Sequence, residues 1–145
     1  MKKLLFATIV TMLVLPTIAM ALPNKTISRA AKEKGAIKTA SGMVYRSTNE
    51  GTGASPGPNS VVVVNYRGTL SDGTEFDSSY KRSQATSFPL SGVIPCWTEG
   101  VQKMKVGGKA KLTCPPELAY GSAGSPPAVP PNATLIFDVE LQEIK

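Results

Sequence analysis

Residues 93–100 read VIPCWTEG. The tryptophan of this stretch, Trp97, is the only one in the chain and begins the most convincing helix of the sequence, predicted over 95–104. Proline suits a first helical turn, because its missing N–H would have no partner there. Trp97, Val101 and Met104 are spaced at i, i+4 and i+7 and share one apolar face. The helix therefore has one side that must pack against another layer.

Segments typical of strands lie on both sides of this helix. Residues 61–70 contain four valines, and the turn SDGT at 71–74 returns the chain into a second strand over 74–78. After the helix, 109–114 and 133–144 alternate apolar and polar side chains. Mostly antiparallel strands with one short helix predict an α+β domain. Trp97 then either fills the core or floors a cavity between helix and sheet, and periodicity alone favours the core.

The start of the chain is organised like a secretory signal peptide over 1–21. Two lysines precede an apolar run over 4–15, and AMA at 19–21 is the small-x-small pattern of a cleavage site. A membrane anchor is the alternative, but the run is short for a span and is followed by a proline. We predict cleavage between Ala21 and Leu22, and a periplasmic or secreted protein without stable membrane insertion.

The formal net charge of +6 is unevenly distributed. Residues 22–40 carry five basic residues and one acidic residue, whereas the rest of the chain after them contains nine of each. We expect 22–41 to form a basic arm before a domain at 42–145, with a short helix over 29–34 capped by Ser28. Such an arm is able to contact nucleic acid or anionic lipid, but is more often a solvated tail. Export argues against nucleic acid.

Composition excludes several kinds of chemistry. The chain has no histidine and two cysteines, so imidazole-based triads and Cys/His metal sites are excluded. No GxxxxGK[ST] or GxGxxG loop is present. We therefore expect no metal and no cofactor.

Five runs occur in one order over about ninety residues: VNYRG at 64–68, DGTEFDSS at 72–79, VIPCWTEG at 93–100, ELAYG at 117–121 and PPNATLIFDVEL at 130–141. Together they resemble the FKBP-type peptidyl-prolyl cis-trans isomerases, the macrolide-binding immunophilins. The runs PPELAYG and IFDVEL resemble exported bacterial members. Some of those begin with a long helical dimerisation region, for which we see only the short arm, so we expect a monomer.

The resemblance implies a curled antiparallel β-sheet wrapped around one short α-helix, with an apolar active-site pocket between them. Trp97 would form the pocket floor, and Asp77 would be the one buried carboxylate at the rim. The Ile94 N–H and the Tyr120 hydroxyl would donate hydrogen bonds to a bound carbonyl. The residues implied as pocket walls and lip are Tyr66, Phe76, Phe88, Val93, Ile94, Phe137, Tyr120, Ala128 and Val129. Asp77 would either contact the ligand or order the neighbouring strand.

Three positions depart from the family pattern. Thr86 stands where an aromatic residue is frequent, two positions before Phe88. Ala128 and Val129 stand where larger aliphatic residues are common, and Cys96 replaces a glycine. The first two departures are expected to thin a pocket wall and its lip, with an effect on macrolide affinity or peptide preference.

The resemblance implies catalysis of cis–trans isomerisation at X-Pro bonds during the folding of exported proteins, with inhibition by macrolides such as tacrolimus or rapamycin. No bond is broken in this reaction, which agrees with the missing nucleophile machinery. The alternative is a chaperone or ligand-binding module that uses the same pocket with little turnover. Thiol–disulfide exchange is disfavoured, because such enzymes use closely spaced cysteines such as CxxC.

Cys96 and Cys114 are candidates for a disulfide. Cys96 begins the predicted helix and Cys114 ends the strand that runs back from it, so both lie toward the same end of this unit. Alternation places Cys114 on the strand face with Leu112, which should meet the helix. An oxidising compartment favours the bond. The alternative is two buried thiols that act as small apolar groups.

Overall fold

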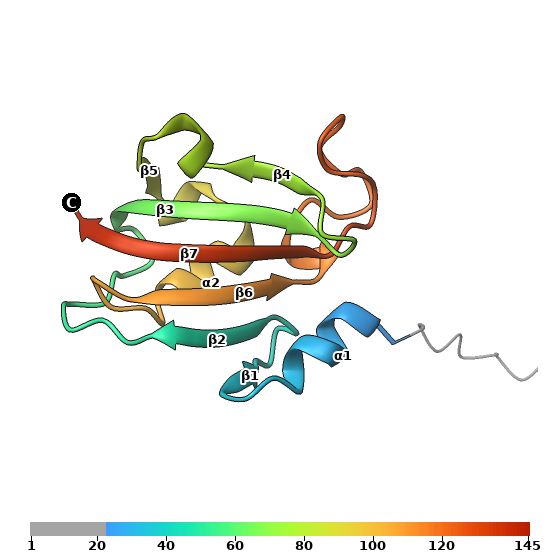
Figure 1. The fold of residues 1–145 in the computed structure, drawn as a ribbon, viewed down its shortest axis with the longest axis horizontal. Coiled ribbons are helices and arrows are strands. Elements are labelled where there is room, and N and C mark those ends of the chain that lie inside the picture. Colours follow the sequence, from blue (N-terminus) through green and yellow to red (C-terminus); the bar gives the residue numbers. More distant parts are fainter. Residues whose placement is uncertain (1–22) are drawn as a thin grey trace, which may run out of the picture.

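A computed structural model describes residues 23–145, so the predicted signal peptide lies outside the described residues. One antiparallel sheet of seven strands runs in the order β1-β2-β6-β7-β3-β4, with β5 also paired to β3 (Figure 1). The strands are β1 (Ala36–Lys38), β2 (Val44–Asn49), β3 (Val61–Leu70), β4 (Glu75–Ser78), β5 (Thr86–Pro89), β6 (Lys109–Cys114) and β7 (Leu135–Ile144). The α-helices are α1 (Lys25–Ala31) and α2 (Pro95–Val101). The predicted α+β class is confirmed.

The two longest strands, β3 and β7, form the centre of the sheet. They pair from Val62 opposite Ile144 to Leu70 opposite Leu135. In β7 the alternate residues from Leu135 to Leu141 are buried, as the sequence pattern predicts. The bounds of β3 and β6 match the prediction, whereas β4 and β7 begin one and two residues later than expected.

Helix α2 lies against one face of this sheet and closes the main core (Figure 1). A Cβ built on Gly100 would lie 2.8 Å from Leu112 Cδ2 and 3.1 Å from Met43 Cε, so the glycine permits the close approach of helix and sheet. The helix ends at Val101 rather than at the predicted residue 104. The chain there tightens into i→i+3 bonds, with Met104 N–H donating to the Val101 carbonyl, and Met104 still reaches the core.

The segment before β2 is folded onto the sheet and is not the solvated tail that we expected. Helix α1 begins earlier than predicted, because Asn24, not Ser28, caps it by accepting a hydrogen bond from the Ile27 N–H at 3.1 Å. Ile27 and Ala30 pack against Val44 of β2 in a second small cluster. Strand β1 pairs antiparallel with β2 at the edge of the sheet.

Alternation along β2 separates the two layers. Val44 joins the cluster beneath α1, whereas its neighbour Tyr45 joins the core beneath α2. The two helices therefore cover opposite faces of the sheet. Over residues 23–145, neither helix has the length and apolar composition needed to cross a bilayer.

Candidate active site

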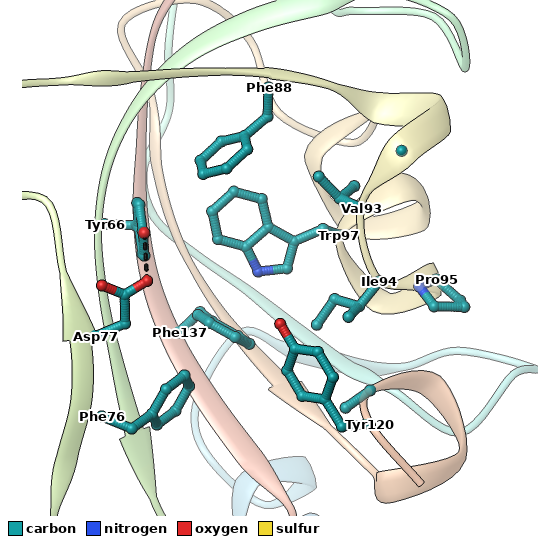
Figure 2. A pocket seen from close by; sticks show the side chains of 12 residues that line it. Tyr66, Phe76, Asp77, Phe88, Val93, Ile94, Pro95, Trp97, Tyr120 and Phe137 are labelled. Atoms are coloured by element: carbon teal, nitrogen blue, oxygen red, sulfur yellow. Dashed lines mark hydrogen bonds between the residues drawn. The ribbon is translucent and has the colours of Figure 1, made fainter. Parts of the chain in front are cut away.

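A cavity of about 470 Å³ opens between α2, the strands β3, β4, β5 and β7, and the loop that follows β6 (Figure 2). Most of its lining is aromatic or aliphatic. The lining residues are Tyr66, Phe76, Asp77, Phe88, Gly92, Val93, Ile94, Pro95, Trp97, Ala119, Tyr120 and Phe137. The cavity thus brings together nine of the residues that the sequence assigned to the pocket.

Trp97 forms the floor, and it is 4% exposed. Three rings surround the indole in edge-to-face contact, with centroids 5.2 Å away for Tyr66, 5.4 Å for Phe88 and 5.3 Å for Phe137. Edge-to-face pairs are favourable because the positive edge of one ring meets the negative face of the other. The two interpretations of Trp97 are therefore both correct, since the residue belongs to the core and also presents a surface to the cavity.

Phe76 and Phe137 form a second aromatic wall. Their rings meet edge to face at 5.6 Å, and both approach β3 at Gly68. A Cβ on Gly68 would lie 2.5 Å from Phe76 Cζ and 3.0 Å from Phe137 Cε1. Glycine is therefore required at this strand position to make room for the wall.

The opposite wall is the turn from Leu90 to Ile94, just before α2. The Thr98 hydroxyl of α2 donates to the Leu90 carbonyl at 2.6 Å, which fastens this turn to the helix. The Ile94 carbonyl accepts the Trp97 N–H at 2.9 Å as the first bond of the helix. Among the described residues, the backbone N–H of Ile94 has no acceptor in the protein. It lies at the cavity wall as an available donor.

Tyr120 closes the remaining side, and it is 42% exposed. Figure 2 shows its hydroxyl directed over the cavity toward Ile94 and Trp97. Two backbone bonds hold the adjacent turn, from the Gly121 N–H to the Pro116 carbonyl at 2.8 Å and from the Asn132 N–H to the Gly121 carbonyl at 2.9 Å. The hydroxyl is therefore a second donor on a supported loop.

Asp77 lies in a hydrogen-bond network at the rim. The Tyr66 hydroxyl donates to its Oδ2 (Figure 2), and its Oδ1 accepts from the Ser78 N–H and from Arg82 Nη1, both at 2.8 Å. Arg82 Nη2 also donates to the Tyr66 hydroxyl at 3.0 Å. The side chain of Asp77 is 40% exposed, so the expectation of a buried carboxylate is wrong. Arg82 supplies much of the network and was missed from the sequence.

The protonation of this network follows from its contacts. Partial burial opposes ionisation of Asp77, but the hydrogen bonds from Tyr66 and Arg82 together hold its pKa below the ordinary value. Burial, and then the hydrogen bond to Asp77, raise the pKa of Tyr66. At neutral pH the pair is therefore an ionised carboxylate that accepts a hydrogen bond from a neutral phenol.

Ala128 and Val129 are not brought to the cavity. Val129 is 3% exposed and packs in the main core, and Ala128 is exposed to solvent. The reason is a tight turn in which Ser125 and Val129 exchange backbone hydrogen bonds at 2.8 and 2.9 Å, which directs the valine inward. Thr86 is also absent from the lining, on β5 beside Phe88. The prediction of a lip at 128–129 is therefore wrong for this structure.

The floor is attached covalently to the sheet. Cys96 and Cys114 form a disulfide between the first turn of α2 and the end of β6, with their Cα atoms 5.8 Å apart. Both residues are fully buried. Because Cys96 precedes Trp97, the bond fixes the helix end that carries the indole.

Known proteins with related sequences include two isomerases of Escherichia coli. FkpA of Escherichia coli K12, an FKBP-type peptidyl-prolyl cis-trans isomerase, is 56% identical over 115 residues, which are 79% of this chain and 42% of that protein. The FKBP-type 22 kDa isomerase of the same organism is 48% identical over 120 residues, or 83% of this chain and 58% of that protein. The chain therefore spans about half the length of these relatives.

Solved structures agree in fold. The crystal structure of FkpA from Escherichia coli matches with a TM-score of 0.80 and 55% identity, over 82% of this chain and 55% of that one. The crystal structure of AtFKBP13 matches with a TM-score of 0.71 and 31% identity, over 76% of this chain and 98% of that one. The family model for FKBP-type peptidyl-prolyl cis-trans isomerases matches residues 53–142. With this match and the relatives above, the chain belongs to the family of FKBP-type peptidyl-prolyl cis-trans isomerases.

Proposed function

We propose that this chain catalyses cis–trans isomerisation of X-Pro bonds in exported proteins. The observation that carries the proposal is the apolar cavity floored by Trp97, with two unused donors, the Ile94 N–H and the Tyr120 hydroxyl, at its border. The cavity has the size of a short peptide turn rather than of a folded domain. Family membership supports the same activity.

The reaction requires only that the site remove water from the amide and favour its twisted shape. Rotation about an amide passes through a twisted state about 18–20 kcal/mol above the planar form. Water stabilises the planar, polarised amide by hydrogen bonds to its oxygen. An apolar cavity removes that water and favours the less polar twisted form, so it binds the transition state better than the ground state.

The lining residues then have separate roles. The face of Trp97 receives the proline ring by shape and dispersion. The Ile94 N–H and the Tyr120 hydroxyl hold the flanking carbonyls in the turned geometry. Both oxygens of Asp77 are already occupied by Tyr66, Ser78 and Arg82, which supports a positioning role that orders the Tyr66 wall over a direct ligand contact.

Inhibition, location and oligomeric state follow from the same proposal. Macrolides such as tacrolimus or rapamycin occupy the same cavity and inhibit the activity. The protein acts in the periplasm or the medium after removal of the segment before Leu22. It acts as a monomer, a state in which the cavity formed by its own residues is complete.

Exchange spectroscopy by NMR on short X-Pro peptides tests the proposal. We expect catalytic amounts of the exported protein to broaden the cis and trans resonances, and tacrolimus to abolish the effect. Peptide binding without faster exchange would support the binding-module alternative, and neither binding nor exchange would refute both.

Tyr120→Phe sharpens the test, because it removes one hydroxyl and keeps the ring. We expect the binding free energy of an X-Pro peptide or of tacrolimus to weaken by about 0.5–1.5 kcal/mol, the usual net value of one hydrogen bond. Titration calorimetry measures the loss, with Tyr80→Phe as the matched control, since Tyr80 lies outside the cavity. Equal affinities for wild type and Tyr120→Phe would remove the hydroxyl from the site.

A further inference from the structure

Helix α1 and the segment after it carry a concentrated positive charge. We call this set the basic face: Lys25, Arg29, Lys32, Lys34 and Lys38. All five are exposed, and none forms an ion pair within residues 23–145. The only acidic residue of the segment, Glu33, is already bound to Arg46 at 2.8 Å and to Lys111 at 3.0 Å. The basic face is therefore not neutralised within the described protein.

The helical part of the basic face points away from the sheet. Lys25, Arg29 and Lys32 are spaced at i, i+4 and i+7 and so share one side of the helix. Ile27 and Ala30 occupy the other side and are buried against the sheet. The packing of α1 thus fixes the orientation of the cations, which a solvated tail would not do.

Part of this charge pattern works against the helix itself. Like charges at i and i+4 destabilise a helix, as Lys25 and Arg29 do here. Lys25 also lies in the first turn, which has no acidic residue, where the helix dipole disfavours a cation, although Arg29 lies in the last turn, where the dipole favours one. The helix forms because Asn24 caps it and the sheet buries its apolar side. An anionic partner would turn this unfavourable pattern into a binding surface.

We propose that the basic face docks on an anionic phospholipid surface, with lipid phosphates opposite the five cations and no insertion into the bilayer. The charges are spread over a helix, a turn and an edge strand, which suits a broad field of headgroup charge. Because α1 and α2 cover opposite faces of the sheet, a protein docked through α1 keeps its cavity open to solution. Docking would hold the site beside a membrane without blocking it.

Vesicle flotation with the exported protein tests this docking. The probe is phosphatidylcholine vesicles with increasing fractions of phosphatidylglycerol. We expect the bound fraction to rise with phosphatidylglycerol and to fall as added salt screens the charges. Each cation contributes about fivefold to the partition coefficient, so Lys25→Gln/Arg29→Gln/Lys32→Gln should weaken binding by about a hundredfold.

The matched control removes the same charge elsewhere. Lys103→Gln/Lys105→Gln/Lys145→Gln changes three exposed lysines outside the basic face, two just after α2 and one just after β7, and should keep most of the binding. Equal losses in the two variants would show a net-charge effect and overturn the proposal. So would absent binding to anionic vesicles, or binding of the wild type to polyglutamate but not to vesicles, which would indicate an acidic protein partner.

Two measurements keep the outcome clear. The Lys25→Gln/Arg29→Gln/Lys32→Gln variant should melt close to wild type, because relief of the repulsion between Lys25 and Arg29 offsets the loss of Arg29 from the last turn, so lost docking is not explained by unfolding. X-Pro exchange on free peptides should be the same in both triple variants. Vesicle binding therefore tests the docking, and X-Pro exchange separately tests the proposed isomerase activity.

Discussion

The two helices of this protein have the same length and very different anchoring. Each has seven residues, but α2 buries Cys96, Trp97, Gly100 and Val101, whereas α1 buries only Ile27 and Ala30. Helix α2 is also joined to β6 by a disulfide, while the polar contacts of α1 are its Asn24 cap, two side-chain hydrogen bonds to Thr134 and Ser71, and the ion pairs of Glu33 just after it. Helices this short are not stable alone, so the contacts of each determine its stability.

This difference predicts an uneven distribution of stability over the molecule. Opening α2 exposes the main core, so it requires global unfolding. Opening α1 exposes one small cluster at the edge of the sheet, so it is expected as a local event.

Trp97→Ala should produce the largest effect. Removing the indole from among its three neighbouring rings should lower the free energy of unfolding by about 3–5 kcal/mol and abolish the catalysis of X-Pro exchange. Circular dichroism in urea is the suitable measurement, because the variant has no tryptophan to report by fluorescence. A loss below that of Ile27→Ala would reverse the ranking of the two helices.

Cys96→Ala/Cys114→Ala should lower the unfolding free energy by about 3 kcal/mol, because the open loop gains entropy in the unfolded chain. Exchange activity below the melting temperature should survive, since neither sulfur lines the cavity. Reductant should lower the melting temperature of wild type and leave that of the double variant unchanged. Two free thiols in the denatured, unreduced wild type would contradict the bond.

Ile27→Ala should destabilise α1 by about 2 kcal/mol, at the low end for a buried isoleucine because its cluster is small. Hydrogen exchange should accelerate for the amides of α1 and of the β1–β2 ladder. The amides of α2 and the rate of X-Pro exchange should not change. Uniform acceleration across the sheet would show that α1 belongs to the same cooperative unit as the core.

Acid should remove a small contribution from Asp77. Its pKa is lowered on folding, so its stabilisation is present above the ordinary value of 3.8 and is lost as the pH falls through the lower folded value. The side chain is 40% exposed, so the effect should stay below about 1 kcal/mol. The difference in unfolding free energy between wild type and Asp77→Asn should therefore shrink on acidification. A difference that does not vary with pH would exclude this linkage.

The parts of the fold that sequence predicted have strong local signals. The run of valines marks β3, the alternation marks β6 and β7, and Pro95 marks the first turn of α2. Strands β1, β2 and β5 were not foreseen. Their residues are mixed in polarity and lie toward sheet edges or beneath the short α1, so their pairing depends on tertiary contacts more than on pattern.

The predicted site residues that belong to regular elements all line the cavity, whereas in turns and loops Val93, Ile94 and Tyr120 line it and Val129 does not. The floor and aromatic walls come from α2, β3, β4, β5 and β7, whose alternation determines the direction of each side chain. Val129 lies in a loop, where the turn with Ser125 and not a periodic pattern sets its direction. Arg82 follows Lys81 in an exposed, charged stretch, and only its distance of five residues from Asp77 hinted at their pairing.

The placement of β7 has a consequence for how the protein is made. Strand β7 joins β3 to β6, so the middle of the sheet requires residues 61–70 and 135–144 together. A chain that emerges from its amino end has no central partner for β3 until the last of these residues appears. Contacts of such large sequence separation also form slowly. The middle of the sheet therefore cannot close until the last strand has been synthesised, so we expect the domain to complete its fold only once its carboxyl end is available.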